Sequence, residues 1–181
     1  MRASLLLGVA GAALACQPNT TRPSFTPLPE AAGTELRLPV PEATRRLAEA
    51  FKADSIPPSK IQPRDGYIET DWFDSRSGRP VGSGRLGSRT VRVRAWADPA
   101  RPGSSQLTVE TLYRPLADPS LPERELERQV PRDHPVAVKV VGTLKKLVDR
   151  YGGSPGPQTE PEPSDARPPD QVDEPEPEPS E

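Results

Sequence analysis

Residues 91–113, VRVRAWADPARPGSSQLTVETLY, contain the pattern that decides the fold. Apolar side chains alternate with Arg92 and Arg94 at the start of this stretch, and the alternation returns in its last eight residues. Because successive side chains of a strand point to opposite faces, the stretch predicts two half-buried strands joined by a hairpin connection over residues 98–105. Pairing of the two strands would bring Glu110 near Arg92 or Arg94.

An aromatic segment before this pair predicts a further strand. Residues 66–73 read GYIETDWF and follow a turn signal at Asp65-Gly66. The alternation is imperfect, and aromatic side chains fall on both faces, so both faces are expected to be partly covered. The expected distribution is Ile68, Thr70 and Trp72 on one face, with Glu69 and Asp71 on the other.

Two segments have the periodicity of amphipathic helices. Over residues 133–151, apolar side chains, Val141 among them, recur at i, i+3, i+4 and i+7 spacing, with Asp133 as the expected N-cap. An earlier helix is expected over residues 41–53, after a short strand over residues 36–40. The order strand, helix, three antiparallel strands and long helix is typical of the α+β class.

Composition places the core in the middle of the chain. The 181 residues include 26 prolines and 13 glycines, and seven of the eight aromatic side chains fall between residues 36 and 151. We therefore expect one α+β domain over residues 36–151, in which one short and one long C-terminal helix pack on an antiparallel sheet of about four strands. Residues 152–181 contain nine acidic side chains and one basic one, and are expected to form a disordered acidic Pro/Glu-rich tail.

The first sixteen residues, MRASLLLGVAGAALAC, have the order of a bacterial lipoprotein signal. One positive charge and an apolar run of about ten residues, too short to cross a bilayer, precede small residues and Cys16. We expect a signal peptide over residues 1–15, and a lipidated Cys16 with a Pro-rich tether over residues 16–35. Gln17, in the position where an aspartate would signal retention in the inner membrane, favours the outer membrane.

Several kinds of site are excluded by the residue types present. With His134 and Cys16 as the only histidine and cysteine, neither a His/Cys zinc site nor an intrachain disulfide can form. Residues 82–87, GSGRLG, fit the pattern G-x-G-x-x-G, but a strand is expected after them where a dinucleotide site needs a helix. We therefore expect no cofactor, no metal and no catalytic residue, and the protein is predicted not to be an enzyme. Nucleic acid is not an expected partner of an exported protein.

In the order of its elements and in the segment GYIETDWF at residues 66–73, the sequence resembles the BamC-type (NlpB/DapX) lipoproteins of the outer-membrane β-barrel assembly machinery. Those proteins carry a similar G-x-[IV]-E-T-[DE]-W segment on a strand. The resemblance covers about residues 36–151, and it implies a helix-grip domain and an accessory role in barrel assembly. Full-length members have two such domains and a long N-terminal segment that wraps a partner, and this chain has room for one domain.

A cluster of arginines supplies the candidate partner or ligand surface. Six arginines fall within the nineteen residues from 76 to 94. They could form a solvated strand face, or bind anionic envelope components, an acidic partner or the acidic tail of the same chain. The two tryptophans could stack on a ligand, although core packing is their expected role. The candidate surface comprises Arg85, Arg89, Arg92, Arg94, Trp72 and Trp96.

These features predict a lipid-anchored, periplasm-facing protein of the outer membrane that acts as a non-catalytic accessory or protein-binding module. Its expected partners are the membrane, through the lipid anchor, and barrel-assembly proteins or anionic envelope components. One alternative is a lipoprotein that binds a small apolar or lipid ligand between the sheet and the C-terminal helix, near Trp72, Phe73 and Trp96. Another is a structural role, in which the acidic tail spaces or contacts the cell wall.

Overall fold

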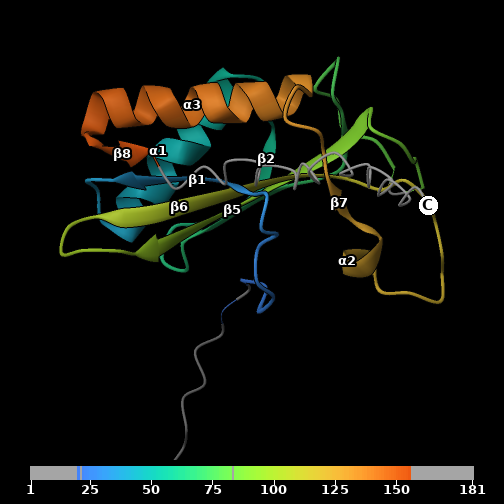
Figure 1. Cartoon of the computed structure of the whole chain (residues 1–181), viewed down its shortest axis with the longest axis horizontal. Helices are drawn as coiled ribbons and strands as arrows, with labels where there is room; N and C mark the ends of the chain where they lie inside the picture. The colour runs from blue at the N-terminus through green and yellow to red at the C-terminus, as the bar shows by residue number, and fades with distance from the viewer. Residues whose placement is uncertain (1–19, 21, 83, 156–181) are drawn as a thin grey trace, which may run out of the picture.

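A twisted antiparallel sheet divides the protein into two unlike layers (Figure 1). The structure is a computed structural model, and it describes residue 20, residues 22–82 and residues 84–155. The spatial order of the main strands is β2-β3-β5-β6-β1-β8, while β4 pairs with β5 and β7 with β6. The strands are β1 (Ala32–Leu36), β2 (Pro58–Gln62), β3 (Tyr67–Thr70), β4 (Phe73–Asp74), β5 (Thr90–Pro99), β6 (Ser105–Tyr113), β7 (Arg128–Gln129) and β8 (Gly153–Pro155), and the helices are α1 (Val40–Ala53), α2 (Glu123–Leu126) and α3 (Pro135–Tyr151).

The α+β class and the antiparallel sheet confirm the prediction, but the expected number of strands was wrong. The structure has eight strands in its described part, where about four were predicted. Six of the eight have between two and five residues. Strands β4, β7 and β8 have only two or three residues, which is too short to show an alternation that could be recognised in the sequence.

The predicted hairpin is the centre of the sheet. Strands β5 and β6 pair in a continuous register in which Val93 lies opposite Thr111 and Arg94 lies opposite Glu110. Since side chains alternate along each strand, most apolar residues of both strands face one side, and the charged residues face the other together with Trp96 and Leu112. We call the mainly apolar side the helix face and the charged side the strap face.

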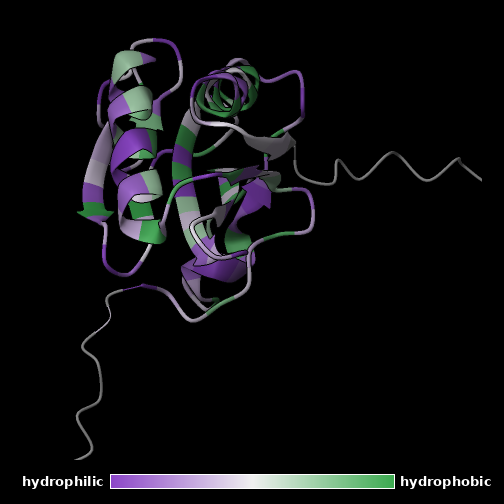
Figure 2. Ribbon diagram, turned by 90° about the vertical axis from the view of Figure 1, so that its left-hand side faces the viewer, coloured by the Kyte–Doolittle hydropathy of each residue, from purple (hydrophilic) through white to green (hydrophobic). Residues whose placement is uncertain are grey.

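Apolar side chains fill the space between the helix face and the two long helices. Leu47 and Phe51 of α1 and Leu144 of α3 are buried in one cluster with β5 and β6 residues such as Val93 and Val109. Burial of each such side chain contributes about 1.5–3 kcal/mol. Figure 2 shows how apolar and polar positions alternate along the helices, as this one-sided packing requires. The core therefore lies on the helix face.

The ends of the two long helices correct one detail of the prediction. Helix α1 covers the expected residues and has a proline in its first turn. In α3 the N-cap is His134 rather than Asp133, because the imidazole Nδ1 accepts a hydrogen bond of 3.2 Å from the backbone N–H of Val136. The other ring nitrogen lies 3.0 Å from the carbonyl oxygen of Ser88, which ties the start of α3 to the loop before β5.

Gly66 begins the GYIETDWF segment because no larger residue fits there. Its φ angle is +64°, and a Cβ atom would lie 2.1 Å from the carbonyl oxygen of Ala97. The Gly66 carbonyl accepts a 2.7 Å hydrogen bond from the Ala97 N–H, so this close approach fixes the start of β3 against β5.

The same segment does not continue as one strand. Strand β3 ends at Thr70 and β4 begins at Phe73, with two residues between them outside any strand. This break changes the side to which the following residues point. Phe73 packs in the helix-face core. The prediction that Trp72 shares a face with Ile68 is wrong, since Trp72 contacts the charged side chains of the strap face.

The domain also has wider boundaries than residues 36–151. Strand β1 begins at Ala32, and β8, which begins at Gly153, pairs with β1. Residues 22–31 lie across the sheet instead of forming a free tether, and we call them the N-terminal strap. The predicted signal peptide, Cys16 and most of the acidic tail lie outside the described residues.

Candidate functional site

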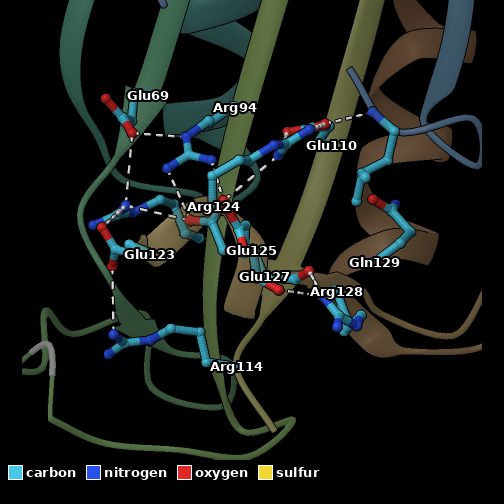
Figure 3. A network of polar contacts seen from close by, with 12 residues as sticks. Glu69, Arg94, Glu110, Arg114, Glu123, Arg124, Glu125, Glu127, Arg128 and Gln129 are labelled. Atoms are coloured by element: carbon cyan, nitrogen blue, oxygen red, sulfur yellow. Dashed lines mark hydrogen bonds and ion pairs between the residues drawn. The ribbon is translucent and has the colours of Figure 1, made fainter. Parts of the chain in front are cut away.

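A network of charged side chains covers the strap face (Figure 3). It joins β3, β5 and β6 to α2 and to the residues beside α2. The network contains four glutamates and four arginines, so their formal charges cancel. Its members are Glu69, Arg92, Arg94, Glu110, Arg114, Glu123, Arg124 and Glu127, and we call it the charge network.

Arg94 occupies the middle of the network and is almost completely buried. Its two terminal nitrogens bind both carboxylate oxygens of Glu127, at 2.5 and 2.8 Å, and its Nε donates to Glu69 at 2.8 Å. The Glu127 side chain has no exposed surface. Burial lowers the pKa of the Arg94 guanidinium, but hydrogen bonds and charges from Glu127 and Glu69 outweigh burial, and the pKa lies above its ordinary value. Arg94 is therefore a fixed cation that holds two carboxylates.

Glu110 is the second buried carboxylate, and it connects α2 with the strap. Arg124 donates to both of its oxygens, at 2.7 and 2.9 Å, and the backbone N–H of Leu28 donates at 2.6 Å. The sequence places Glu110 near Arg94, and the two residues do lie opposite each other in register. The Glu110 carboxylate nevertheless binds Arg124. Strand pairing alone could not predict this contact, because Arg124 lies on a helix.

Trp72 lies between two arginines of the network. The guanidinium carbons of Arg92 and Arg114 are 4.5 and 4.8 Å from the centre of its ring. Its indole N–H donates a 2.9 Å hydrogen bond to Glu123. Burial raises the pKa of Glu123, but the indole N–H and the two arginines outweigh burial and keep it below its ordinary value. The tryptophan of the GYIETDWF segment thus packs against charged groups.

The N-terminal strap closes the network over Trp96. Phe25 meets the Trp96 ring edge to face at 6.1 Å between centroids, and Arg124 lies 4.4 Å from the Phe25 ring centre. Arg22 forms a 2.6 Å ion pair with Asp98 at the far end of the strap. Phe25 is the one aromatic residue that lies outside the predicted domain, and the structure shows that it belongs to the fold.

The six residues of the predicted surface do not form one surface. Arg94, Trp72 and Trp96 are buried, and the Arg92 side chain is only 15% exposed. Arg85 and Arg89 are exposed in the loop before β5. The sequence could not separate the buried from the exposed residues, because two of the glutamates that pair with the strand arginines, Glu123 and Glu127, follow much later in the chain.

Arg89 itself forms a 3.0 Å ion pair with Asp74. Hydrogen bonds from Ser77 and Arg76, together with the charge of Arg89, lower the pKa of Asp74 to about 2. These contacts hold the turn after β4 in place.

The charge network has the chemistry of a structural element. Its buried carboxylates are occupied by arginines and by the strap, and within residues 20, 22–82 and 84–155 no three potential metal ligands cluster. Two surface hollows, of about 300 and 410 Å³, are lined by residues near Arg101 and by the strap, and neither is lined by a tryptophan. Trp72 and Phe73 point to opposite faces of the sheet, so they share no cavity.

An exposed apolar stripe on α3 was missed by the sequence analysis. Val138 and Val141 are 56% and 52% exposed, although Val141 was expected to belong to the buried stripe. Gly142 continues the same outer face, and a Cβ atom there would meet nothing within 4 Å. The lysines at positions 139 and 145 flank the stripe and are also exposed. The spacing of Val138, Val141 and Gly142 could have revealed the stripe, because i, i+3 and i+4 share one side of a helix.

No family model, curated protein or solved structure matches the chain. The resemblance to BamC-type lipoproteins and the helix-grip arrangement therefore stay predictions that rest on the sequence. In the part of the chain that the structure describes, no helix has both the length and the apolar character needed to cross a bilayer.

Proposed function

We propose that this chain is a lipid-anchored, periplasm-facing protein of the outer membrane that binds a protein partner through the outer face of α3, without catalysis. The observation that carries the proposal is the pair of valines at positions 138 and 141, which lie one helical turn apart on the outer face of α3 and are each more than half exposed. Exposed apolar side chains with a polar surround are typical of protein-binding surfaces.

The charge around these valines indicates the chemistry of the partner. Lys139 and Lys145 are exposed beside them, whereas Lys146 already binds Asp54 at 2.9 Å. A matching surface presents apolar side chains with carboxylates at the rim, where complementary charge speeds association and selects the partner. The resemblance to BamC-type lipoproteins suggests barrel-assembly proteins as the source of this surface.

Ligand binding between sheet and helices has less support. That alternative needs an apolar cavity beside Trp72, Phe73 and Trp96, but Phe73 lies on the helix face, whereas both tryptophans lie on the strap face. The space between the helix face and α3 holds closely packed core side chains such as Phe51 and Leu144.

Site-specific photo-crosslinking in envelope membranes tests the proposal. A crosslinking amino acid replaces Val141 in one variant and the exposed Arg76 in the matched control. We expect a barrel-assembly subunit to be captured from position 141 and not from position 76, and to be lost in Cys16→Ala, which cannot be lipidated. Equal capture from both positions, or capture that does not depend on Cys16, would contradict the proposal.

A further inference from the structure

The strap places the N-terminal end of the domain on a defined side of the molecule. Arg22 is held by Asp98 at 2.6 Å and by the carbonyl oxygen of Asp65 at 3.1 Å, so the domain is fixed from Arg22 onwards. Only six residue steps separate Arg22 from Cys16, which is at most about 20 Å of extended chain. The following inference rests on the proposed lipid at Cys16, because that lipid would hold the strap side of the domain close to the bilayer.

The loop between β6 and α2 reaches out on this same side. Figure 1 shows the loop and the start of the strap as the parts that extend furthest from α3. Figure 2, turned by 90° about the vertical axis, again shows the strap on the side opposite the long helices. Within this loop Leu116 is 51% exposed and Leu121 is 43% exposed. The loop on this side of the molecule therefore carries two large apolar side chains that are exposed to solvent.

Several positions of this loop would lose no N–H hydrogen bond on leaving water. Residues 115–122 read PLADPSLP, and the three prolines have no N–H group that would lose a hydrogen bond to water. The N–H groups of Ser120 and Leu121 already donate to the side chain and the carbonyl oxygen of Asp118. Asp118 is the one ionisable residue of the loop, and Ser120 binds its carboxylate through N–H and hydroxyl at 2.9 and 2.6 Å.

We propose that residues 115–122 form a membrane-contacting loop, in which Leu116 and Leu121 enter the interface of the phospholipid bilayer that holds the lipid of Cys16. The loop is then a second contact beside the lipid anchor, and it fixes the orientation of the domain. The outer face of α3, on the other side of the sheet, points away from this membrane and towards partners. Three observations support the bilayer as the surface that this loop contacts. The chain between Arg22 and Cys16 is short, the loop and the strap lie on one side of the molecule, and two leucines of the loop are exposed.

Tryptophan quenching in vesicles tests the orientation. The full-length lipidated protein is reconstituted in vesicles of phosphatidylethanolamine and phosphatidylglycerol, with or without bromine on the acyl chains. Leu116→Trp is compared with Val141→Trp, whose site is equally exposed but lies on α3. Trp72 and Trp96 are buried and give the same background in both variants. We expect brominated lipid to remove the added fluorescence at position 116 and to leave that at position 141 unchanged.

Intact mass and vesicle flotation of the same samples separate the two proposals. A protein that carries no lipid and does not float overturns both the anchor and the orientation. A lipidated protein that floats, with quenching at position 141 or at neither position, overturns the orientation alone. Leu121→Trp, also at an exposed site, repeats the measurement should Leu116→Trp fold poorly.

Discussion

The two faces of the central sheet are held by different kinds of interaction. On the helix face, Val93 and Val109 meet Phe51 and Leu144 in an apolar core. On the strap face, the same two strands carry Arg94 and Glu110, which are buried with charged partners. Apolar contacts depend on shape and area, whereas buried charges depend on specific partners because an unpaired buried charge is costly. One face therefore tolerates repacking, and the other determines which segments can cover it.

This difference explains why the strap and α2 occupy fixed places although each is short. Neither segment has an apolar side of the kind that holds α1. Arg124, together with the backbone N–H of Leu28, satisfies Glu110, and Glu127 satisfies Arg94. The strap and α2 are thus positioned by the partners that they supply to Glu110 and Arg94.

The largest expected effect comes from removing one buried charge on the strap face. Glu127→Gln keeps the shape but removes the fully buried one of the two carboxylates that Arg94 holds, and we expect it to lower the free energy of unfolding by about 3–5 kcal/mol. Urea unfolding followed by circular dichroism measures the loss.

A double variant is the control for that measurement. Arg94→Met with Glu127→Leu removes one positive and one negative charge together, and it should cost less than Glu127→Gln alone. A double variant that is less stable than the single one would show that the strap face does not depend on charge pairing.

A smaller loss is expected from a cavity on the helix face. Leu144→Ala removes a buried side chain of α3 and should lower the free energy of unfolding by about 2–4 kcal/mol. Because no charge is involved, the loss should be the same at neutral and mildly acidic pH. A marked change of this loss with pH would contradict the distinction drawn between the faces.

The strap should contribute less than either layer. Phe25→Ala removes the edge-to-face contact with Trp96 and the arginine contacts of the ring, which together are worth about 1–2 kcal/mol. Hydrogen exchange of the Leu28 amide should become faster, since this N–H donates to Glu110. Ser24→Ala, at an exposed neighbouring site, should leave that exchange rate unchanged. Equal rates in both variants would mean that Phe25 does not hold the strap.

The smallest effect concerns a polar contact between the two long helices. Asp54, after α1, accepts hydrogen bonds from Thr143 and Lys146 of α3, and these lower its pKa below the ordinary value of 3.8. Asp54→Asn should cost about 0.5–1 kcal/mol at neutral pH. Since the pKa is lower in the folded state, the ionised form stabilises the fold above about pH 4, and the benefit falls away as the pH drops through the folded pKa.

Thermal melts of wild type and Asp54→Asn over a pH series measure this dependence. The difference in melting temperature should be constant near neutral pH and vanish in acid. A difference that grows on acidification would have the wrong sign for a lowered pKa.

The helix face could be predicted from the sequence because its signal is local. The alternation in residues 91–113 and the helical spacing up to Tyr151 each occur within one element, so the hairpin, α1 and α3 were found. Val141 was misplaced because α3 turns only part of its apolar side towards the sheet.

The strap face could not be predicted because its contacts join distant segments. Phe25 lies in a Pro-rich stretch without periodicity, and nothing in that stretch indicates that Trp96, seventy-one positions later, receives it. Glu123 and Glu127 belong to a polar segment broken by prolines, in which the sequence indicates at most a short helix. The arginines on the strand were therefore assigned to a surface, because two of the glutamates that pair with them, Glu123 and Glu127, lie about thirty residues later in the chain.

The position of the strap also determines how the protein would respond to mechanical force. Tension applied to the chain before Thr20 would first load the contacts made by the side chains of Arg22 and Phe25 and by the backbone N–H of Leu28, which can break one after another. Strand β1 would be loaded next, and it is clamped between β6 and β8. Single-molecule pulling from the N-terminal side should therefore record a weak early rupture before the sheet yields, and a single rupture would rule this order out. The strap would let the domain move a short way from a fixed N-terminus without unfolding.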